Sequence, residues 1–204
     1  MRKGRLYVLS GPSGAGKGTI CKAVMDQGDP ELALSVSMTT RAPREGEVNG
    51  VSYYFVTQEE YDRTVAEDGF LEHAGIYGNC YGTPKAPALE KLNAGIDLIL
   101  EIEMQGALQV KKSYPDARLI FILPPSLEVL KKRLRGRGTE SEEQLKRRTG
   151  AAIEEIHRIV DYDYFVVNDE LQDAVARVNA IISAGRQEID ERAAEIVKNY
   201  EEEK

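Results

Sequence analysis

The segment GPSGAGKGT, residues 11–19, constrains the fold more than any other part of the sequence. It contains the pattern G-x-x-x-x-G-K, follows the apolar run RLYVLS and precedes the helical pattern KGTICKAVMDQ. Glycines between a buried strand and a helix let backbone N–H groups and the positive helix end surround a phosphate chain. The sequence therefore predicts a phosphate-binding loop in which Lys17 neutralises the β- and γ-phosphates of a nucleotide.

Apolar runs and helical patterns alternate along the rest of the chain. The runs are continuously apolar, which is typical of parallel strands that are buried on both faces. They predict an α/β fold with a parallel sheet between helices. The expected strands lie near residues 5–10, 97–103, 118–124 and 163–169. The expected helices are 17–27, 104–114, one after Ser126, one from a capping box at Thr139 or Ser141 toward Asp161, and one from about Leu171, with NYEEEK as a frayed end.

Two segments interrupt this alternation. Residues 36–88 contain strand-like pieces, VSYYFV and FLEHAGIYGN, around a short helix that Thr57 and Glu60 would open, which predicts a small mixed α/β subdomain. Residues 126–148 are rich in Lys and Arg. Both segments follow core strands, so we expect them over the carboxyl edge of the sheet, where open α/β sheets bind ligands.

Composition limits the partners and the compartment. The chain has 204 residues, 42% of them hydrophobic, and a formal net charge of −7, which favours one globular core and gives no reason to expect nucleic acid or a membrane surface as a partner. Cys21 and Cys80 lack C-x-x-C spacing, and no apolar run is long enough for a membrane span or a secretion signal. We expect a cytoplasmic protein, and the sequence does not indicate its oligomeric state.

Groups suited to proton transfer are few, since His73 and His157 are the only histidines. A phosphate monoester is already an anionic nucleophile near neutral pH, so phosphoryl transfer to it requires no general base. The charge would then be neutralised by arginines, which predict a basic flap that closes on the transferring group. The alternative is a solvated helix-loop-helix whose arginines pair with Glu140, Glu142 and Glu143. The arginines concerned are Arg133, Arg135, Arg137, Arg147 and Arg148.

A second anion site is predicted by SVSMTTRAPREGEVNGVSYYF, residues 35–55. Two guanidiniums, from Arg41 and Arg44, together with the Tyr53 hydroxyl suit a phosphate monoester dianion. Glu72 could accept two parallel hydrogen bonds from N1–H and N2–H of guanine, whereas N1 of adenine is an acceptor and would be repelled. A Ser37 hydroxyl could serve guanine O6. The alternative is an exposed hairpin with ordinary surface arginines.

Together these segments closely resemble the guanylate kinase family over nearly the full chain. The resemblance implies transfer of phosphate from ATP to GMP with Mg²⁺ by a P-loop NTPase core (1–35, 89–125 and 149–204). It also implies a GMP-binding subdomain (36–88) and a helical basic lid (126–148). The segments that carry it are GPSGAGKGT, SVSMTTRAPREGEVNGVSYYF, FLEHAGIYGNCYGTP, LEIEMQGA, IFILPPS, LKKRLRGRGTESEEQLKRR and VVNDEL.

The resemblance further implies roles for individual residues. The implied GMP-binding set is Ser37 and Glu72 on guanine, Arg41, Arg44, Tyr53 and Tyr81 on the phosphate, and Glu47, Thr83, Glu101 and Glu103 around them. The implied ATP-binding set is Gly11, Pro12, Ser13, Gly14, Ala15, Gly16, Lys17, Gly18 and Thr19, with Asn168 near the adenine. The implied catalytic set is Lys17, Arg44, Arg133, Arg137 and Arg148.

The chain departs from the family pattern at two places that bear on the metal. Glu101 and Glu103 replace a pair often written D-x-D, and Gly18 stands where the family commonly has Ser or Thr. The stretch GAGKGT is similar to the adenylate kinase loop, which transfers phosphate without that hydroxyl. We therefore expect no direct protein ligand for Mg²⁺, which ATP oxygens and water would hold with Glu101 behind the water. A third position, Thr83, keeps the hydroxyl of the Ser found in some members.

Two other functions compete with this interpretation. A kinase for AMP or a ribose phosphate shares the general plan, but an adenine pocket would leave Glu72 unpaired. A non-catalytic guanylate-kinase-like binding domain typically loses the loop lysine and the lid arginines, whereas this chain keeps Lys17, Arg133, Arg137 and Arg148.

Overall fold

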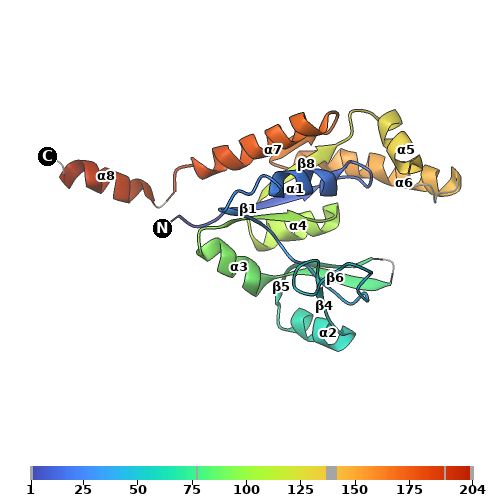
Figure 1. The fold of residues 1–204 in the computed structure, drawn as a ribbon, viewed down its shortest axis with the longest axis horizontal. Helices are drawn as coiled ribbons and strands as arrows, with labels where there is room; N and C mark the ends of the chain where they lie inside the picture. Colours follow the sequence, from blue (N-terminus) through green and yellow to red (C-terminus); the bar gives the residue numbers. More distant parts are fainter. Residues whose placement is uncertain (1, 77, 137–141, 191, 203–204) are drawn as a thin grey trace.

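The core of the protein is a five-stranded parallel sheet in the order β2-β7-β1-β8-β9 (Figure 1). The computed structural model describes residues 2–76, 78–136, 142–190 and 192–202. The parallel pairing of the five strands confirms the predicted α/β fold with a parallel sheet. The strands are β1 (Leu6–Ser10), β2 (Leu32–Leu34), β7 (Asp97–Glu101), β8 (Arg118–Leu123) and β9 (Tyr164–Val167).

Helices cover both faces of this sheet because its central strands are apolar on both faces. Every residue of β1 is buried. On one face Tyr7 and Leu9 pack with α1 (Lys17–Met25) and α7 (Leu171–Arg186). On the other, apolar side chains of β1 and β7 pack with α3 (Lys85–Asn93) and α4 (Met104–Ser113). The continuous apolarity of the strands thus becomes a three-layer core.

The inserted subdomain has its own four-stranded sheet, in the order β4-β3-β6-β5. Its helix α2 (Gln58–Ala66) begins at the predicted capping box, in which Thr57 Oγ1 accepts from the Glu60 N–H and the Glu60 carboxylate accepts from the Thr57 N–H. Tyr61 of α2 packs on Phe70 with ring centroids 5.0 Å apart. The strands are β3 (Met38–Thr39), β4 (Tyr54–Phe55), β5 (Phe70–Ile76) and β6 (Asn79–Pro84).

Helix α4 holds the subdomain against the core along the outer edge of β5. The Gln109 amide donates to the His73 carbonyl and accepts from the His73 N–H, both at 3.1 Å, in the way a neighbouring strand would. Ser113 Oγ donates to the Leu71 carbonyl at 2.8 Å. These bonds place Glu72, between the two, at a fixed position relative to α4.

The basic segment forms two helices beside the phosphate loop (Figure 1). Helix α5 (Leu127–Arg135) begins at the predicted N-cap, since Ser126 Oγ accepts from the Val129 N–H at 3.2 Å. Helix α6 (Glu142–His157) continues into a 3-10 turn, η1 (Arg158–Asp161). The predicted starts of this helix at Thr139 or Ser141, and Arg137, lie outside the described residues.

The structure differs from the sequence-based expectation in several elements. Strand β7 ends at Glu101 rather than at 103, because the next helix, α4, already has its N-cap at Glu103. Strands β2, β3 and β6 and helix α3 were not predicted, and α3 crosses the expected domain boundary at residue 88. Residues 199–202 of the expected frayed end belong to helix α8 (Arg192–Glu202). This helix extends away from the core (Figure 1). None of the described helices has the length and apolarity needed to cross a membrane.

Candidate functional site

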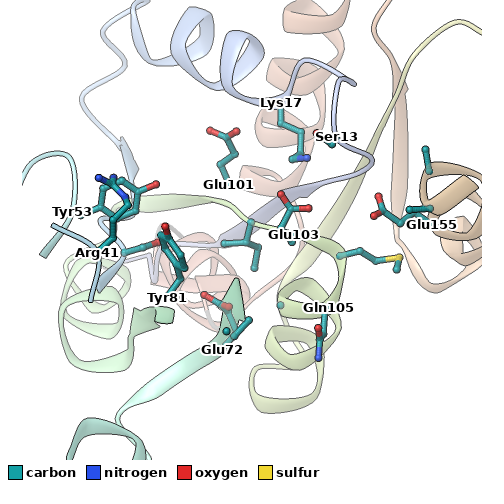
Figure 2. A pocket seen from close by; sticks show the side chains of 18 of the residues that line it. Ser13, Lys17, Arg41, Tyr53, Glu72, Tyr81, Glu101, Glu103, Gln105 and Glu155 are labelled. Atoms are coloured by element: carbon teal, nitrogen blue, oxygen red, sulfur yellow. The ribbon is translucent and has the colours of Figure 1, made fainter. Parts of the chain in front are cut away.

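A cavity of about 880 Å³ lies where the phosphate loop, the inserted sheet, α4 and α6 meet (Figure 2). It brings eight of the ten predicted GMP-binding residues together with Ser13, Lys17 and Arg148, although they come from distant parts of the chain. It is lined by Ser13, Lys17, Ser37, Arg41, Arg44, Tyr53, Glu72, Ala74, Gly75, Tyr81, Glu101, Ile102, Glu103, Met104, Gln105, Gly106, Arg148, Ala151, Ala152 and Glu155.

The phosphate loop turns directly into α1 through Gly16. Gly16 has φ +92°, in the left-handed region that favours glycine, and a Cβ there would lie 2.3 Å from Nδ2 of Asn168. Lys17 Nζ donates to the Gly11 carbonyl at 2.6 Å, so its amine lies over the loop whose N–H groups would hold phosphate. The ammonium of Lys17 therefore lies directly over the predicted phosphate loop.

Asn168 contacts the phosphate loop from the end of β9. The side-chain Nδ2 of Asn168 donates to the Ala15 carbonyl at 2.8 Å. The backbone carbonyl of Asn168 accepts from Nη2 of Arg133 at 2.9 Å. The residue is only 6% exposed. The side-chain amide is thus hydrogen-bonded to the loop, and the predicted position of Asn168 near adenine stays a prediction. Nη1 of Arg133 is buried and has no hydrogen-bond partner among the described residues.

Helix α6 also reaches the loop. Arg148, at the end of the predicted lid segment, donates from Nη2 to Ser13 Oγ at 2.5 Å and so contacts the loop directly. Arg135 and Arg147 are exposed and do not line the cavity. The structure thus separates the basic residues of the segment into those that face the loop and those that face solvent.

The predicted anion site of the inserted subdomain is built around Arg41. Its guanidinium pairs with both Glu47 oxygens, at 2.8 and 3.0 Å, and this pairing raises the pKa of Arg41. Glu47 also accepts from the Arg44 N–H at 2.7 Å. Arg41 lies 5.5 Å from the centre of the Tyr53 ring, which meets Tyr81 edge to face. Glu47 therefore positions the loop and its arginine, and Arg41, Tyr53 and Tyr81 all line the cavity.

Glu72 is a buried carboxylate at the far end of the same cavity. It is 6% exposed, and its Oε1 accepts from Thr83 Oγ1 at 2.7 Å. Burial raises the pKa of Glu72, and the hydrogen bonds from Thr83 partly oppose this rise. A Cβ at Gly106 would lie 2.7 Å from Glu72 Oε2, so the absence of a side chain at this position makes room for the carboxylate. Sequence reasoning did not single out Gly106.

Glu101 and Glu103 lie between these two ends of the cavity (Figure 2). Glu101 ends β7 beside the loop, and a Cβ at Gly18 would lie 3.2 Å from its Oε1. Neighbouring protein atoms exclude water from the Glu101 carboxylate, and this desolvation raises its pKa, although Lys17 lowers it. Glu103 stands at the N-cap of α4 without using its side chain as a cap, which leaves its carboxylate to face the cavity.

Glu155 is a further cavity residue that sequence reasoning missed. Its Oε2 is buried and lacks a hydrogen-bond partner among the described residues. Burial raises the pKa of Glu155, and Glu103 raises it further, while Lys17 lowers it. In the sequence it is the second of two adjacent glutamates in a helical pattern, which is typical of a solvated surface.

Comparisons with known proteins give the family of the chain. The family model described as guanylate kinase matches residues 3–185. The chain is 52% identical over 200 residues to guanylate kinase of Clostridium acetobutylicum. The match covers 98% of this chain and 95% of that protein. It is 48% identical over 203 residues to guanylate kinase of Clostridioides difficile, with 100% and 98% covered.

The chain belongs to the guanylate kinase family. A crystal structure of guanylate kinase from Anaplasma phagocytophilum superposes with a TM-score of 0.73 at 32% identity, covering 92% of this chain and 88% of that one. Guanylate kinases are thus similar to this chain both in sequence and in the arrangement of the core.

Proposed function

We propose that the protein transfers the γ-phosphoryl group of ATP to GMP, giving ADP and GDP. The observation that carries the proposal is a single cavity that joins the phosphate loop around Lys17 to the buried carboxylate of Glu72. The loop suits the polyphosphate of a donor, and the carboxylate suits the two N–H donors of guanine. In family terms, a core (1–35, 89–125 and 149–204) would act with a GMP-binding subdomain (36–88) and a lid (126–148).

GMP would bind with its base toward Glu72 and its phosphate toward Arg41. Guanine N1–H and N2–H would donate to the Glu72 carboxylate, which Thr83 already orients, and Ser37 would serve O6. The phosphate dianion would lie against the guanidiniums and phenols of the inserted subdomain, Arg41, Arg44, Tyr53 and Tyr81. The same carboxylate would repel the N1 acceptor of adenine, which would exclude AMP.

ATP would bind along the phosphate loop, residues 11–19. Lys17 would replace its hydrogen bond to the Gly11 carbonyl with bonds to phosphate oxygens. Arg148, beside Ser13, would contact the same phosphates. The buried and unpartnered Nη1 of Arg133 would gain an acceptor. Arg137 would join these residues, by analogy with the family. Asn168 would support ATP binding through the loop.

The transfer itself needs positioning more than proton chemistry. A phosphate oxygen of GMP would attack the γ-phosphorus in line, and the bond from that phosphorus to the β–γ bridging oxygen would break, so that ADP leaves. The GMP phosphate is already anionic, so no base removes a proton. Lys17, Arg44, Arg133, Arg137 and Arg148 would neutralise the charge spread over the transferring oxygens.

The cavity fits a hydrated Mg²⁺ held with ATP. When bound, Mg²⁺ would add positive charge at the β- and γ-oxygens. Gly18 offers no hydroxyl, but the Glu101 carboxylate borders the space where a side chain at position 18 would lie. Because Mg²⁺ keeps several waters, Glu101 and Glu103 would accept hydrogen bonds from those waters rather than bind the ion directly.

The test of this function is an ADP-release assay with ATP and Mg²⁺ that compares GMP, AMP, UMP and CMP as acceptors. Of the four acceptors, we expect only GMP to be turned over. Lys17→Ala should reduce this turnover by a factor on the order of 10² or more, while GMP affinity changes little. Lys22→Ala is the matched control, since Lys22 lies on the exposed face of α1 and pairs with Asp26. Equal turnover with AMP, or full activity of Lys17→Ala, would refute the proposal.

We also infer a cytoplasmic location, which is supported by the two cysteines. Cys21 and Cys80 are both free thiols in the structure. A reducing compartment keeps such thiols in this state.

A further inference from the structure

Glu155 is unusual among the acidic residues around the cavity because its Oε2 is buried without a hydrogen-bond partner among the described residues. Other partly buried carboxylates have donors: Glu72 accepts from Thr83, and Glu47 accepts from Arg41. An unpaired buried acceptor costs free energy, so it is expected to find a donor in some state of the protein.

The position of Glu155 on α6 indicates where that donor would come from. Glu155 lies two helical turns after Arg148, on the same face of the helix, and Arg148 contacts Ser13 of the phosphate loop. Between them Ala151 and Ala152 line the cavity with small side chains. Figure 2 shows Glu155 directed into the part of the cavity that also holds Glu103, Lys17 and Ser13.

Among the described residues, no protein group donates a hydrogen bond to Glu155 Oε2. The Tyr162 hydroxyl, which interacts electrostatically with Glu155, is likewise buried without a hydrogen-bond partner there. Lys17 attracts Glu155, but its Nζ donates to the Gly11 carbonyl at 2.6 Å. Glu103 is an acceptor of like charge. The phosphates of ATP would add further acceptors and further negative charge, so ATP alone would make the environment of Glu155 less favourable.

We propose that Glu155 is a positioning residue that accepts a hydrogen bond from the water shell of the magnesium ion held by ATP. This inference rests on the proposed function, and extends it to helix α6, which crosses the boundary between the proposed lid and the core at residue 148. Water on Mg²⁺ is the one donor that would arrive together with the phosphates, and Mg²⁺ retains several of its waters when it binds nucleotide. Glu103 from α4 and Glu155 from α6 would hold this shell from two sides.

The arrangement has a consequence for the lid. Arg148 and Glu155 are parts of one helix, so contacts of the hydrated metal with Glu155 and of phosphate with Arg148 would stabilise the same position of α6. Magnesium would therefore strengthen ATP binding through helix α6, beyond its direct contact with the phosphates. ATP without the metal would lack this contribution.

The experiment is calorimetric titration of ATP, without GMP, in the presence of Mg²⁺ and in the presence of a chelator. It compares the full chain with Glu155→Gln, Glu155→Asp and Glu154→Gln. Glu154 is the matched control, because it is the preceding residue of α6 and its side chain is exposed. The quantity of interest is the ratio of the two ATP affinities, which needs no turnover. Thermal unfolding of each variant is recorded alongside.

In Glu155→Gln we expect the gain in affinity from Mg²⁺ to fall roughly tenfold, with ATP affinity in chelator unchanged or higher. Glu155→Asp should keep part of the gain, and Glu154→Gln should keep all of it. A purely structural role would lower thermal stability and change both affinities together. An unchanged ratio in Glu155→Gln, or an equal loss in Glu154→Gln, would overturn the inference. If the unaltered chain failed to bind ATP under either condition, the proposed function itself would fail.

Discussion

A Cβ atom at Gly18 would lie 3.2 Å from Oε1 of Glu101, so the carboxylate borders the space that a side chain at position 18 would enter. The two residues come from α1 and from the end of β7. The chain thus has no hydroxyl at this position of the loop, and it has a long acidic side chain beside it. The neighbour of position 18 is the end of a side chain rather than backbone, so it can move aside.

Gly18→Ser should fold normally and should bind MgATP at lower magnesium concentrations than the unaltered chain. The added hydroxyl would supply the metal contact that Ser or Thr provides in other phosphate-binding loops. Magnesium titration of ATP affinity measures the effect. Gly18→Ala is the control, because it adds the same Cβ without the hydroxyl. Superimposable titration curves for the Ser and Ala variants would show that the hydroxyl does not reach the metal.

Glu72→Gln should weaken GMP binding by about 10- to 100-fold, because the amide offers one acceptor where the carboxylate offers two and removes the charge. ATP affinity should not change, since Glu72 lies at the opposite end of the cavity from the loop (Figure 2). Titration of GMP in the absence of ATP measures this. Unchanged GMP affinity would remove Glu72 from the base pocket.

The same variant carries a prediction for pH. Burial raises the pKa of Glu72 above its ordinary value in the folded protein. Its contribution to the free energy of unfolding is therefore complete at acid pH, below the unfolded pKa, and is lost as the pH rises through the folded pKa. Glu72→Gln does not undergo this loss. The melting temperature of the variant, relative to the unaltered chain, should thus increase from about pH 4 to about pH 8.

Gly106→Ala should weaken GMP binding, although the residue would not touch GMP in the proposed complex. A Cβ at this position of α4 would lie 2.7 Å from Glu72 Oε2 and would displace the carboxylate. Gly150→Ala is the control, since a Cβ at Gly150 in α6 meets nothing within 4 Å. The control should be neutral or more stable by up to about 1 kcal/mol. Equal GMP affinities of the two variants would contradict the assigned role of Gly106.

Asn168→Ala should lower the free energy of unfolding by about 1–3 kcal/mol, because it leaves the buried Ala15 carbonyl without its donor. It should also weaken binding of ATP and GTP by the same factor, if the amide acts through the loop. Asn179→Ala is the control, since its amide bonds to Gln27 at an exposed site. A selective loss of ATP over GTP would instead indicate direct contact between Asn168 and adenine.

Much of the fold could be predicted from short segments of sequence. The phosphate loop, the buried strands and the capping box of Thr57 and Glu60 each depend on residues that are close together in the chain. Their backbone geometry follows from glycine at positive φ, continuous apolarity and local hydrogen bonds. The resemblance between whole segments and the guanylate kinase family extended these local predictions to a site.

Only the tertiary structure decided how distant residues divide the work of that site. Gly106 makes room for Glu72, Asn168 bonds to Ala15, and Glu155 faces the phosphate loop across the cavity. Each relationship joins segments more than 30 positions apart, so no local pattern in the sequence reveals the contact. The sequence by itself determined which chemical groups the protein has and which elements carry them. Packing of α4, α6 and β9 around the loop determined which of those groups meet, because burial and distance exist only in the folded chain.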